Sequence, residues 1–419
     1  MAEILFLAHR VPFPPNRGDK IRAHHILAKL ATLGPVHVGC FAEDEKDRVC
    51  ESDLAAAAKS HCLVDRRKPL ALAGVEAVLS HKPVSLTAFH SNRLESWVKQ
   101  TLAANPIDTI FVFSGQMGQY IPADFRGRVI VDLCDVDSAK FESYAEAGER
   151  VWLNAREGRL LAREEERLGR RSDAAILISE NEAELYQSRL QKPDGITVQA
   201  VGNGIDAQFF DPKKAQPHHA LSEQIGPHFV YTGQMDYLPN VQAAAWIIEA
   251  FLPAIRTKFP DAEFHVVGRN PAAQLLKQKD RPGVTIWGEV ADVRPFLTGA
   301  DMVLAPLTIA RGVQNKVLEA MAMARPVMLT TQAATGISAE DGTDWMIARA
   351  HAEEMCKRAA AAFENTELLD SMCQSARQFV LNHHDWDAVL QPLETLVQPM
   401  LQPSNQAMGQ RPLEAAHGS

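Results

Sequence analysis

Residues 300–327, ADMVLAPLTIARGVQNKVLEAMAMARPV, carry the strongest fold signal in the chain. The apolar run 302–305 predicts a buried strand, a loop leads to a helix that begins near Gln314, and another strand starts at Pro326. A helix N-terminus offers unpaired N–H groups and the positive end of a dipole, which suit a diphosphate. Gly312 would let the backbone approach such a ligand closely. The stretch therefore predicts an anion site at the start of a helix.

Two charged residues in the predicted helix indicate what the site would hold. Lys316 lies in the first turn and Glu319 follows three residues later, so both project from one face. A cation at the phosphates and a carboxylate that accepts ribose hydroxyls form a chemically sensible pair. The alternative is a weak salt bridge on an exposed helix face. A lysine in the first turn opposes the helix dipole, which favours the binding interpretation.

The same alternation of short apolar runs and helical patterns extends along the chain. Near-continuous apolar runs suit strands that are buried on both faces, hence parallel sheets covered by helices. At 419 residues the chain is longer than a single hydrophobic core usually organises, which favours two domains. We therefore predict an α/β fold of two facing, doubly wound, Rossmann-like domains joined near residue 205, with a ligand cleft at the carboxyl ends of the strands. The predicted strands are 4–7, 36–41, 109–113, 129–133, 174–178, 229–232, 263–267, 284–287, 302–305 and 327–330.

Composition excludes several classes of protein. A net charge of −9 argues against a general nucleic-acid binder. The six cysteines are scattered without metal or redox spacing, which favours a reducing compartment. No signal peptide and no run of about 20 apolar residues is recognisable. We expect a cytoplasmic protein, or one peripheral to the inner face of the membrane. The arginines and glutamates between residues 149 and 171 predict a solvated, salt-bridged helix more than a membrane-facing one.

The run Lys-Val-Leu-Glu-Ala-Met-Ala at 316–322, followed by Pro-Val, resembles the donor signature of the family-four retaining glycosyltransferases, which have the GT-B fold. Further segments resemble this family in the same order. They are 201–206, 231–240, 267–268, 288–290 and 384–387. Arg-Gly-Val-Gln-Asn-Lys at 311–316 and the segment 135–145 also resemble sugar transferases of the exosortase (PEP-CTERM) systems, which accompany exopolysaccharide synthesis.

The resemblance implies an arrangement of domains and a donor site. The arrangement is an acceptor-side domain at 1–204, a donor domain at 205–380, a helix at 381–401 that crosses back, and a disordered tail at 402–419. Two departures matter: Arg311 stands where many members have a second glutamate, and the usual Arg and Lys pair after the Gly233 loop is missing. Arg311 and Lys316 would then carry the diphosphate charge. The implied donor-binding residues are Gly233, Gly268, Val290, Arg311, Gly312, Val313, Gln314, Asn315, Lys316 and Glu319.

The first domain contributes candidates for the acceptor side of the cleft. The loop after the first strand leads into Gly18, Asp19, Lys20 and Arg22, which could meet a phosphate or could be a proline-stiffened turn with solvated charges. Asp132, Asp135 and Asp137 end or follow a strand, and such carboxylates can bind a divalent metal. Aspartates also cap helices and shape turns, so we favour an acceptor-side or structural role and predict no metal. Ser114 begins another loop after a strand, and no general base can be named.

The function implied by the resemblance is transfer of a sugar from a nucleotide-diphosphate donor, with retention of configuration, to a glycan or polyprenyl-diphosphate-linked precursor of exopolysaccharide or cell envelope. No cofactor is expected beyond the nucleotide sugar substrate. A nucleotide-sugar epimerase on the same fold and a non-catalytic nucleotide-sugar-binding protein stay open as alternatives. A dinucleotide-dependent oxidoreductase is disfavoured, because no Gly-x-Gly-x-x-Gly follows an early strand.

Overall fold

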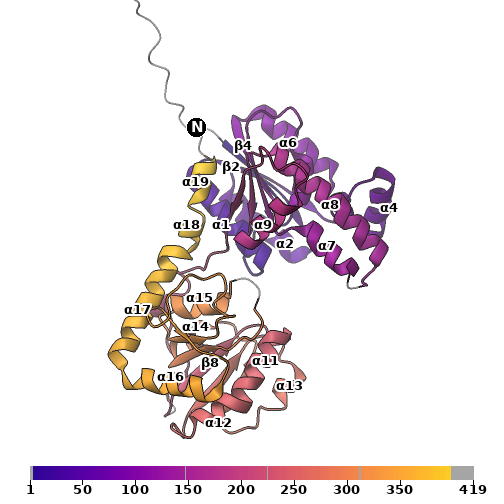
Figure 1. The fold of residues 1–419 in the computed structure, drawn as a ribbon. Coiled ribbons are helices and arrows are strands. Elements are labelled where there is room, and N and C mark those ends of the chain that lie inside the picture. Colours follow the sequence, from indigo (N-terminus) through magenta and orange to yellow (C-terminus); the bar gives the residue numbers. More distant parts are fainter. Residues whose placement is uncertain (1–2, 147, 224, 311–312, 398–419) are drawn as a thin grey trace, which may run out of the picture. The chain divides into compact units, whose positions relative to one another are not determined.

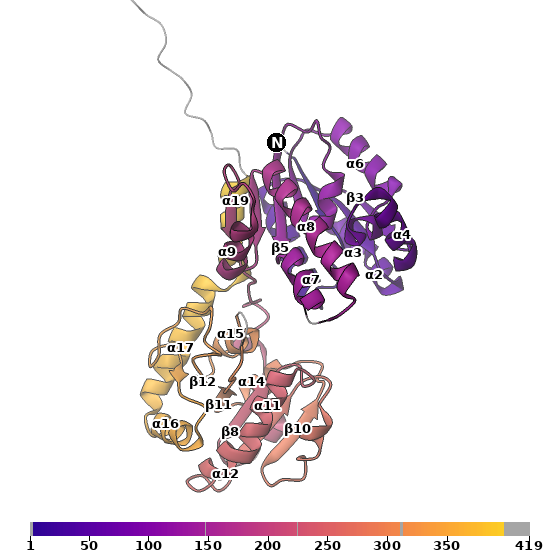
Figure 2. The ribbon, with the colours of Figure 1, turned by 45° about the vertical axis from the view of Figure 1, so that its right-hand side comes forward.

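The computed structural model describes residues 3–146, 148–223, 225–310 and 313–397. The chain forms two compact units: unit 1 contains residues up to Ala200 and the segment from Leu390, and unit 2 contains Val201–Val389. Each unit is a parallel β-sheet with helices on both faces (Figures 1 and 2).

Unit 1 has a seven-stranded parallel sheet in the order β3-β2-β1-β4-β5-β6-β7. The order reverses between β1 and β4, which is the topological switch point of a doubly wound sheet. The strands are β1 (Glu3–Ala8), β2 (Val36–Ala42), β3 (Ser60–Asp65), β4 (Ile107–Phe113), β5 (Arg128–Cys134), β6 (Ala174–Leu177) and β7 (Val198–Ala200). The helices are α1 (Gly18–Leu33), α2 (Glu45–Val49), α3 (Glu51–Ala57), α4 (Leu70–Ser80), α5 (Val84–Ala88), α6 (Asn92–Ala104), η1 (Gly115–Tyr120), α7 (Asp137–Glu146), α8 (Val151–Arg171), α9 (Glu180–Arg189) and α19 (Pro392–Val397).

The last described helix belongs to unit 1, although it follows unit 2 in the chain. Helix α19 packs against α1, where Lys29 pairs with Glu394. The Arg128 guanidinium at the start of β5 donates to the carbonyl oxygen of Leu396 at 2.6 Å. Residues almost 400 positions apart in the chain therefore share one domain.

Unit 2 has a six-stranded parallel sheet in the order β10-β9-β8-β11-β12-β13, with its switch point between β8 and β11. The strands are β8 (His228–Thr232), β9 (Glu263–Val267), β10 (Val284–Gly288), β11 (Met302–Ala305), β12 (Val327–Leu329) and β13 (Met346–Ile347). The helices are η2 (Pro212–Lys214), α10 (His219–Ser222), α11 (Leu238–Trp246), η3 (Ile247–Phe251), α12 (Leu252–Ile255), α13 (Ala273–Leu276), α14 (Arg294–Thr298), α15 (Asn315–Ala322), α16 (Ala352–Glu364), α17 (Thr366–His383) and α18 (Trp386–Val389).

The fold confirms the predicted pair of Rossmann-like domains with parallel sheets. All ten strands predicted from apolar runs are present, and the strands of each central sheet are buried along most of their length. Sequence analysis missed β3, β7 and β13, which are short or begin with polar residues. One described helix, Leu238–Ile255, is long and apolar enough to cross a membrane, but it packs in the core of unit 2 through residues such as Ile248 and Phe251.

Candidate donor site

A pocket of about 520 Å³ opens at the carboxyl ends of β8 and β9 in unit 2. This is the edge at which ligands bind in doubly wound sheets. The pocket lies beside the switch point, and α15 forms one of its walls. Its lining residues are Thr232, Gly233, Gln234, Asn240, Val267, Gly268, Arg269, Glu289, Val290, Val293, Asn315, Lys316 and Glu319.

Two glycines bring the loops after β8 and β9 into backbone contact. Gly268 has φ +158°, and a Cβ there would lie 1.7 Å from the carbonyl oxygen of Gly233. Gly233 has φ +148°, and a Cβ there would lie 3.1 Å from the Nζ atom of Lys316. Only glycine satisfies both the backbone angles and the available space. The floor of the pocket is therefore main chain, which is what close approach of a diphosphate requires.

Helix α15 presents an apolar face to the core and a polar face to the pocket. Val317, Leu318 and Met321 are fully buried, whereas Asn315, Lys316 and Glu319 line the pocket. The predicted pairing of lysine and glutamate on one helix face is thus present.

A buried polar network of Asn240 and Tyr231 holds the Lys316 ammonium group in place. Its Nζ atom donates to Asn240 Oδ1 at 2.6 Å and to the Tyr231 hydroxyl at 3.0 Å, and it lies 4.5 Å from the centre of the Tyr231 ring. Tyr231 is fully buried and its hydroxyl also donates to Asn240 Oδ1 at 2.9 Å. These contacts fix the position of the charge at the pocket floor, close to Gly233.

Burial changes the protonation behaviour of both charged residues. Desolvation lowers the pKa of Lys316 to about 8, although the nearby Glu319 carboxylate acts in the opposite direction. Desolvation likewise raises the pKa of Glu319 to about 7, although Lys316 acts against the rise. Two groups with such shifted pKa values in one pocket make the pocket a candidate functional site.

The structure brings together most of the predicted donor residues. Gly233, Gly268 and Val290 line the pocket together with the three polar residues of α15. Gln314 occupies the position before α15 and Val313 is 39% exposed, and neither lines the pocket. Arg311, Gly312 and the predicted tail at 402–419 lie outside the described residues.

Sequence analysis missed several residues that line the pocket or support Lys316 from behind it. Asn240 and Tyr231 lie in the segment that supported the family resemblance, but nothing in one sequence shows that they meet a lysine 76 or more positions later. Arg269 could have been predicted from the sequence, because it directly follows the predicted Gly268. It supplies a cation to the rim of the pocket. Its guanidinium donates to Gln234 Oε1 at 3.1 Å.

In unit 1 the predicted acceptor-side residues gather at the carboxyl edge of the central strands. Asp19, just after the start of α1, accepts from Arg17 at 2.8 Å and pairs with His9 and Arg10, the two residues that follow β1. Burial acts to raise the pKa of Asp19, but hydrogen bonds from His9 and Arg10 outweigh it and hold the pKa well below its usual range. The sequence did not predict His9 and Arg10 as site residues, because isolated residues after a strand belong to no motif with a recognisable spacing.

The other cations of this loop are engaged within the unit. Lys20 is buried and donates to Asp47 and, at 3.1 Å, to the carbonyl oxygen of Phe13. Arg22 is 2% exposed and its Nε donates to Asp132 at 2.8 Å. Their charges are balanced by buried carboxylates, and a contact of either one with a ligand phosphate stays a prediction.

The three aspartates of the predicted acidic cluster point to different partners. Asp132 is fully buried against Arg22, Asp137 begins α7 and pairs with Lys140 at 3.6 Å, and Asp135 is exposed. Partial desolvation by the surrounding chain, together with the like charges of Glu182 and Asp137, raises the pKa of Asp135 even though part of its side chain reaches solvent. Ser114, the first residue after β4, has φ +77°, an unusual backbone angle for a non-glycine residue. Gly18, at the start of α1, has open space around it.

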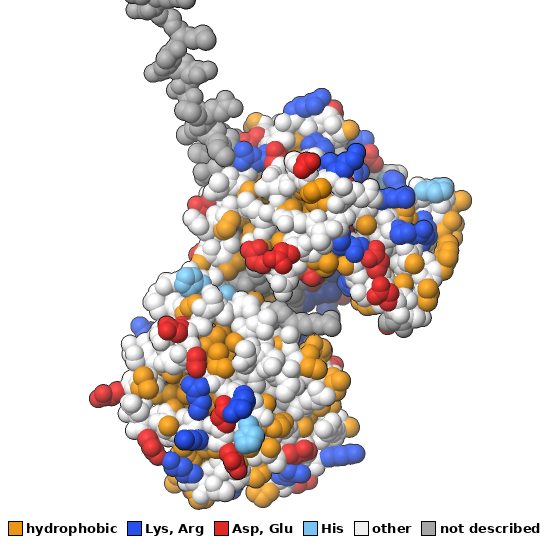
Figure 3. Space-filling model, in the orientation of Figure 1, with side chains coloured by type: hydrophobic (Ala, Val, Ile, Leu, Met, Phe, Trp, Pro, Cys, Tyr) orange, Lys and Arg blue, Asp and Glu red, His pale blue; other side chains and the backbone are white. Residues whose placement is uncertain are grey.

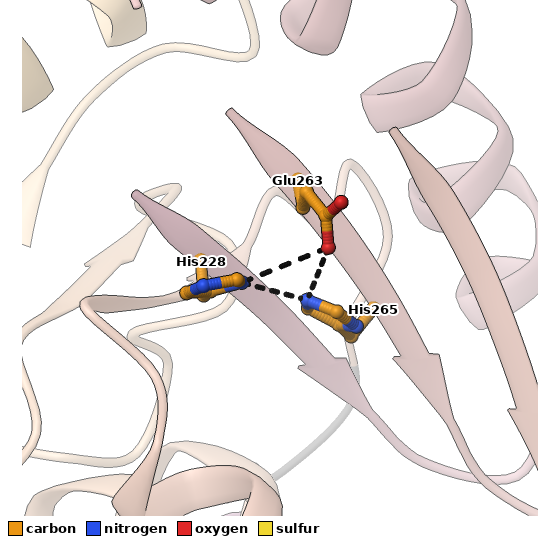
Figure 4. Close-up of side chains that lie close together, drawn as sticks. All are labelled: His228, Glu263 and His265. Atoms are coloured by element: carbon orange, nitrogen blue, oxygen red, sulfur yellow. Dashed lines mark hydrogen bonds and ion pairs between the residues drawn. The ribbon is translucent and has the colours of Figure 1, made fainter. Parts of the chain in front are cut away.

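A second polar cluster lies at the opposite edge of the unit 2 sheet. His228 and Glu263 begin β8 and β9, and His265 follows on β9, so that the three side chains converge (Figure 4). The nitrogen atoms of the two imidazoles are 3.0 Å apart, and the Glu263 carboxylate lies 3.6 Å from His265 and 3.9 Å from His228. Two imidazoles and a carboxylate at such spacing are a ligand set for Zn²⁺.

Hydrogen bonding argues against a preformed metal site in this cluster. The Trp287 indole, which can only donate, lies 3.3 Å from Nδ1 of His265, so this atom accepts and the proton is on Nε2. Nε2 faces Nδ1 of His228 and would have to lose that proton before binding a metal. Burial lowers the pKa of His265 to about 3, so that the ring is neutral. We assign the cluster as a hydrogen-bonded chain that joins β8, β9 and β10 through His228, His265 and Trp287.

Comparisons with known proteins agree with this architecture. Residues 226–365, about a third of the chain, match the family described as Glycosyl transferases group 1. The comparison with curated proteins finds no match. The fold is similar to HepE from Anabaena in complex with UDP, with a TM-score of 0.62 and 15% identity over 94% of this chain and 99% of HepE.

Two further solved structures have the same fold. Sucrose-phosphate synthase from Thermosynechococcus elongatus aligns with a TM-score of 0.58 and 14% identity, covering 94% of this chain and 98% of the synthase. A mutant TarM from S. aureus, in complex with fondaparinux, alpha-GlcNAc-glycerol and UDP, aligns with a TM-score of 0.59 and 10% identity, covering 95% and 100%. These are GT-B structures, and the two Rossmann-like units described above have that fold.

Proposed function

We propose that this protein, a glycosyltransferase with a group 1 domain at residues 226–365, moves a sugar from a nucleoside diphosphate to a glycan or lipid-linked precursor of exopolysaccharide or cell envelope. The observation that carries the proposal is the pocket in which Lys316 and Glu319 project from one face of α15 over a glycine-lined floor. These three features match the chemistry of a nucleoside diphosphate: the cation and the accessible backbone suit its phosphates, and the carboxylate suits its ribose hydroxyls.

The diphosphate would lie against Gly233 and the start of α15. Lys316 supplies a charge fixed by Asn240 and Tyr231, and Arg269 supplies a second cation from the loop after β9. Arg269 would thereby compensate for the missing pair of cations after Gly233. Fixed positive charge at a leaving diphosphate stabilises the charge that develops in the transition state.

The nucleoside would occupy the other end of the pocket. Glu319 would accept hydrogen bonds from the two ribose hydroxyls, and Val290 and Val293 offer apolar contact for the base. HepE and TarM were solved with UDP, so we propose uridine as the base. We further propose retention of configuration, with the departing diphosphate taking the proton of the acceptor hydroxyl.

We place the reaction in the cytoplasm, at the inner face of the membrane if the acceptor is lipid-linked. All six cysteines are free, which fits a reducing compartment. The resemblance to the exosortase-associated transferases suggests exopolysaccharide synthesis as the pathway. No cofactor beyond the nucleotide sugar is proposed.

The proposal is tested by calorimetry and turnover with a panel of nucleotide sugars. The full chain should bind UDP or a UDP-sugar, and Glu319→Gln should weaken binding. Glu289→Gln, at an exposed carboxylate that lines the same pocket from the loop after β10, should change binding little. Release of nucleoside diphosphate that depends on an added acceptor would distinguish a transferase from an epimerase. Binding without any turnover would support the binding-protein alternative, and no binding of any nucleotide sugar would refute the donor site.

A further inference from the structure

Helix α4 in unit 1 presents its large apolar side chains to the outside. Leu72, Val75, Val78 and Leu79 are between 50% and 77% exposed, whereas the buried residues of the helix are the two alanines Ala73 and Ala77. On a helical wheel the four large residues form one stripe opposite the alanines. A helix that only covers its own domain would have the reverse arrangement.

Helix α8 adds a basic stripe with a tryptophan at its end. Trp152, Arg156, Arg159 and Arg163 recur at spacings of four, three and four residues, so that they share one face. Trp152 is 69% exposed. The buried residues of α8, such as Leu161 and Leu168, lie on the opposite face.

The two helices meet at a small basic pocket. Arg156 donates to the carbonyl oxygens of Ala77 at 2.7 Å and Lys82 at 3.2 Å, which joins the end of α4 to the stripe of α8. A hollow of about 170 Å³ next to this junction is lined by His81, Arg156, Arg159, Leu160 and Arg163. Figure 3 shows hydrophobic side chains along the edge of unit 1 where α4 lies, with basic and acidic side chains next to them.

Arginines on other parts of α8 differ from those at the hollow. Arg167 and Arg170 pair with Glu164 and Glu166 on the same helix, as expected for a solvated surface. Over the part of the chain that the structure describes, Arg159 and Arg163 have no carboxylate partner. Their charge is therefore available to an external anion.

We propose that the α4–α8 surface, defined as Leu72, Val75, Val78, Leu79, Trp152 and the arginines of the hollow, docks the protein on an anionic lipid bilayer. The apolar stripe would enter the boundary between headgroups and acyl chains, Trp152 would lie at the interface, and the arginines would bind lipid phosphates. A protein partner could cover an apolar stripe, but the adjacent Arg159 and Arg163, which have no carboxylate partner among the described residues, fit a surface of phosphates. The inference specifies the proposed contact with the membrane and does not depend on the identity of the donor.

The test is co-sedimentation of the full chain with vesicles of phosphatidylcholine alone and with about 30% phosphatidylglycerol, at low and physiological salt. We expect binding to the anionic vesicles that weakens with salt, since surface charges are screened. Leu72→Asp/Leu79→Asp should reduce the partition coefficient at least tenfold. Arg159→Gln/Arg163→Gln should reduce it about fivefold for each charge removed.

Matched control variants distinguish binding through the α4–α8 surface from a general effect of exposed hydrophobic or charged residues. Val49→Asp changes a side chain in unit 1 that is 77% exposed, as is Leu79, and should leave binding unchanged. Lys99→Gln/Arg349→Gln removes the same number of charges elsewhere. Melting temperature and UDP affinity should stay the same in all of these variants. Failure of the membrane proposal would therefore not refute the proposed donor site.

Three results would overturn the proposal. They are equal binding to neutral and anionic vesicles, unchanged binding of the Leu72→Asp/Leu79→Asp variant, and no binding of the wild-type chain even at low salt. A concentration-dependent dimer that this variant abolishes would instead assign the surface to a second copy of the chain.

Discussion

Glu319→Gln separates the contribution of this residue to ligand binding from its contribution to stability. The amide keeps the shape of the side chain but cannot accept two hydroxyl protons as a charged group. Loss of a charge-assisted contact costs about 1–3 kcal/mol, which weakens binding by about 5- to 150-fold at pH 8. As a surface partner of Lys316, Glu319 would contribute nothing to binding.

The pKa of Glu319 predicts the pH dependence of this effect. Because burial raises the pKa to about 7, part of the population is protonated near neutrality and must lose a proton to bind ribose as a carboxylate. Wild-type affinity should therefore rise with pH up to about 7, by at most tenfold per pH unit, and Glu319→Gln should remove this acid limb. UDP-glucose is the appropriate ligand, because its phosphate diesters do not titrate in this range.

The stability of the empty protein should change in the other direction. A folded pKa raised above the unfolded value stabilises the protein at low pH, and this contribution is lost as the pH rises from about 4.5 to about 7. Above pH 7 the ionised, desolvated carboxylate therefore destabilises the fold, and Glu319→Gln relieves this cost. The variant should melt at the same temperature as wild type or higher at pH 8, while binding more weakly. Calorimetry at pH 6, 7 and 8 with UDP-glucose measures the affinities, and a variant that binds as tightly as wild type at pH 8 would refute the ribose assignment.

Four further predictions follow from the structure. Lys316→Ala should weaken UDP-sugar binding by about 10- to 150-fold and remove the loss of affinity expected above pH 8, and unchanged calorimetric affinity would exclude the phosphate assignment. Gly268→Ala should abolish nucleotide binding and lower the melting temperature, because its Cβ would overlap the Gly233 carbonyl group; calorimetry and thermal melting of the same sample would show both effects or contradict the steric argument. Turnover should survive EDTA, and a complete loss that Mn²⁺ restores would assign a metal to Asp135 and Asp137. The pKa of His265 is lowered to about 3 in the folded protein, so on acidification the unfolded chain binds a proton at this residue before the folded protein does. The free energy of unfolding should therefore fall by up to about 1.4 kcal/mol per pH unit below about pH 6.5. In urea denaturation between pH 5 and 7, the free energy of unfolding of His265→Gln should depend less steeply on pH than that of wild type.

The sequence predicted those features that depend on local pattern. Apolar runs such as 129–133 and 302–305 located strands, because a strand buried on both faces must be apolar throughout. The positions of Lys316 and Glu319 on one helix face followed from helix periodicity alone. The short strands β7 and β13 have too few residues to show any periodicity.

Contacts between segments that are distant in the chain could not be predicted from one sequence. The Lys20 and Arg22 side chains looked like free cations at a helix start, but Asp47 and Asp132 neutralise them inside the unit. Nothing in the spacing of Arg22 and Asp132, which are 110 residues apart, could predict that pair. The same holds for the exposed stripe of α4, because its alanine and leucine positions become meaningful only once the buried face is known.

The return of α19 to unit 1 has a consequence for the order in which the protein can fold during synthesis. Unit 2 is one continuous segment, Val201–Val389, so all of its strands have been translated before the ribosome reaches Pro392. Unit 1 is complete only when α19 has left the exit tunnel and can pack on α1. The domain that is started first is therefore finished last, contrary to the usual order in which the N-terminal domain folds first. A released chain that ends before Pro392 would contain all of unit 2 and a unit 1 that lacks its final helix, so that the α1 surface under α19 would be uncovered.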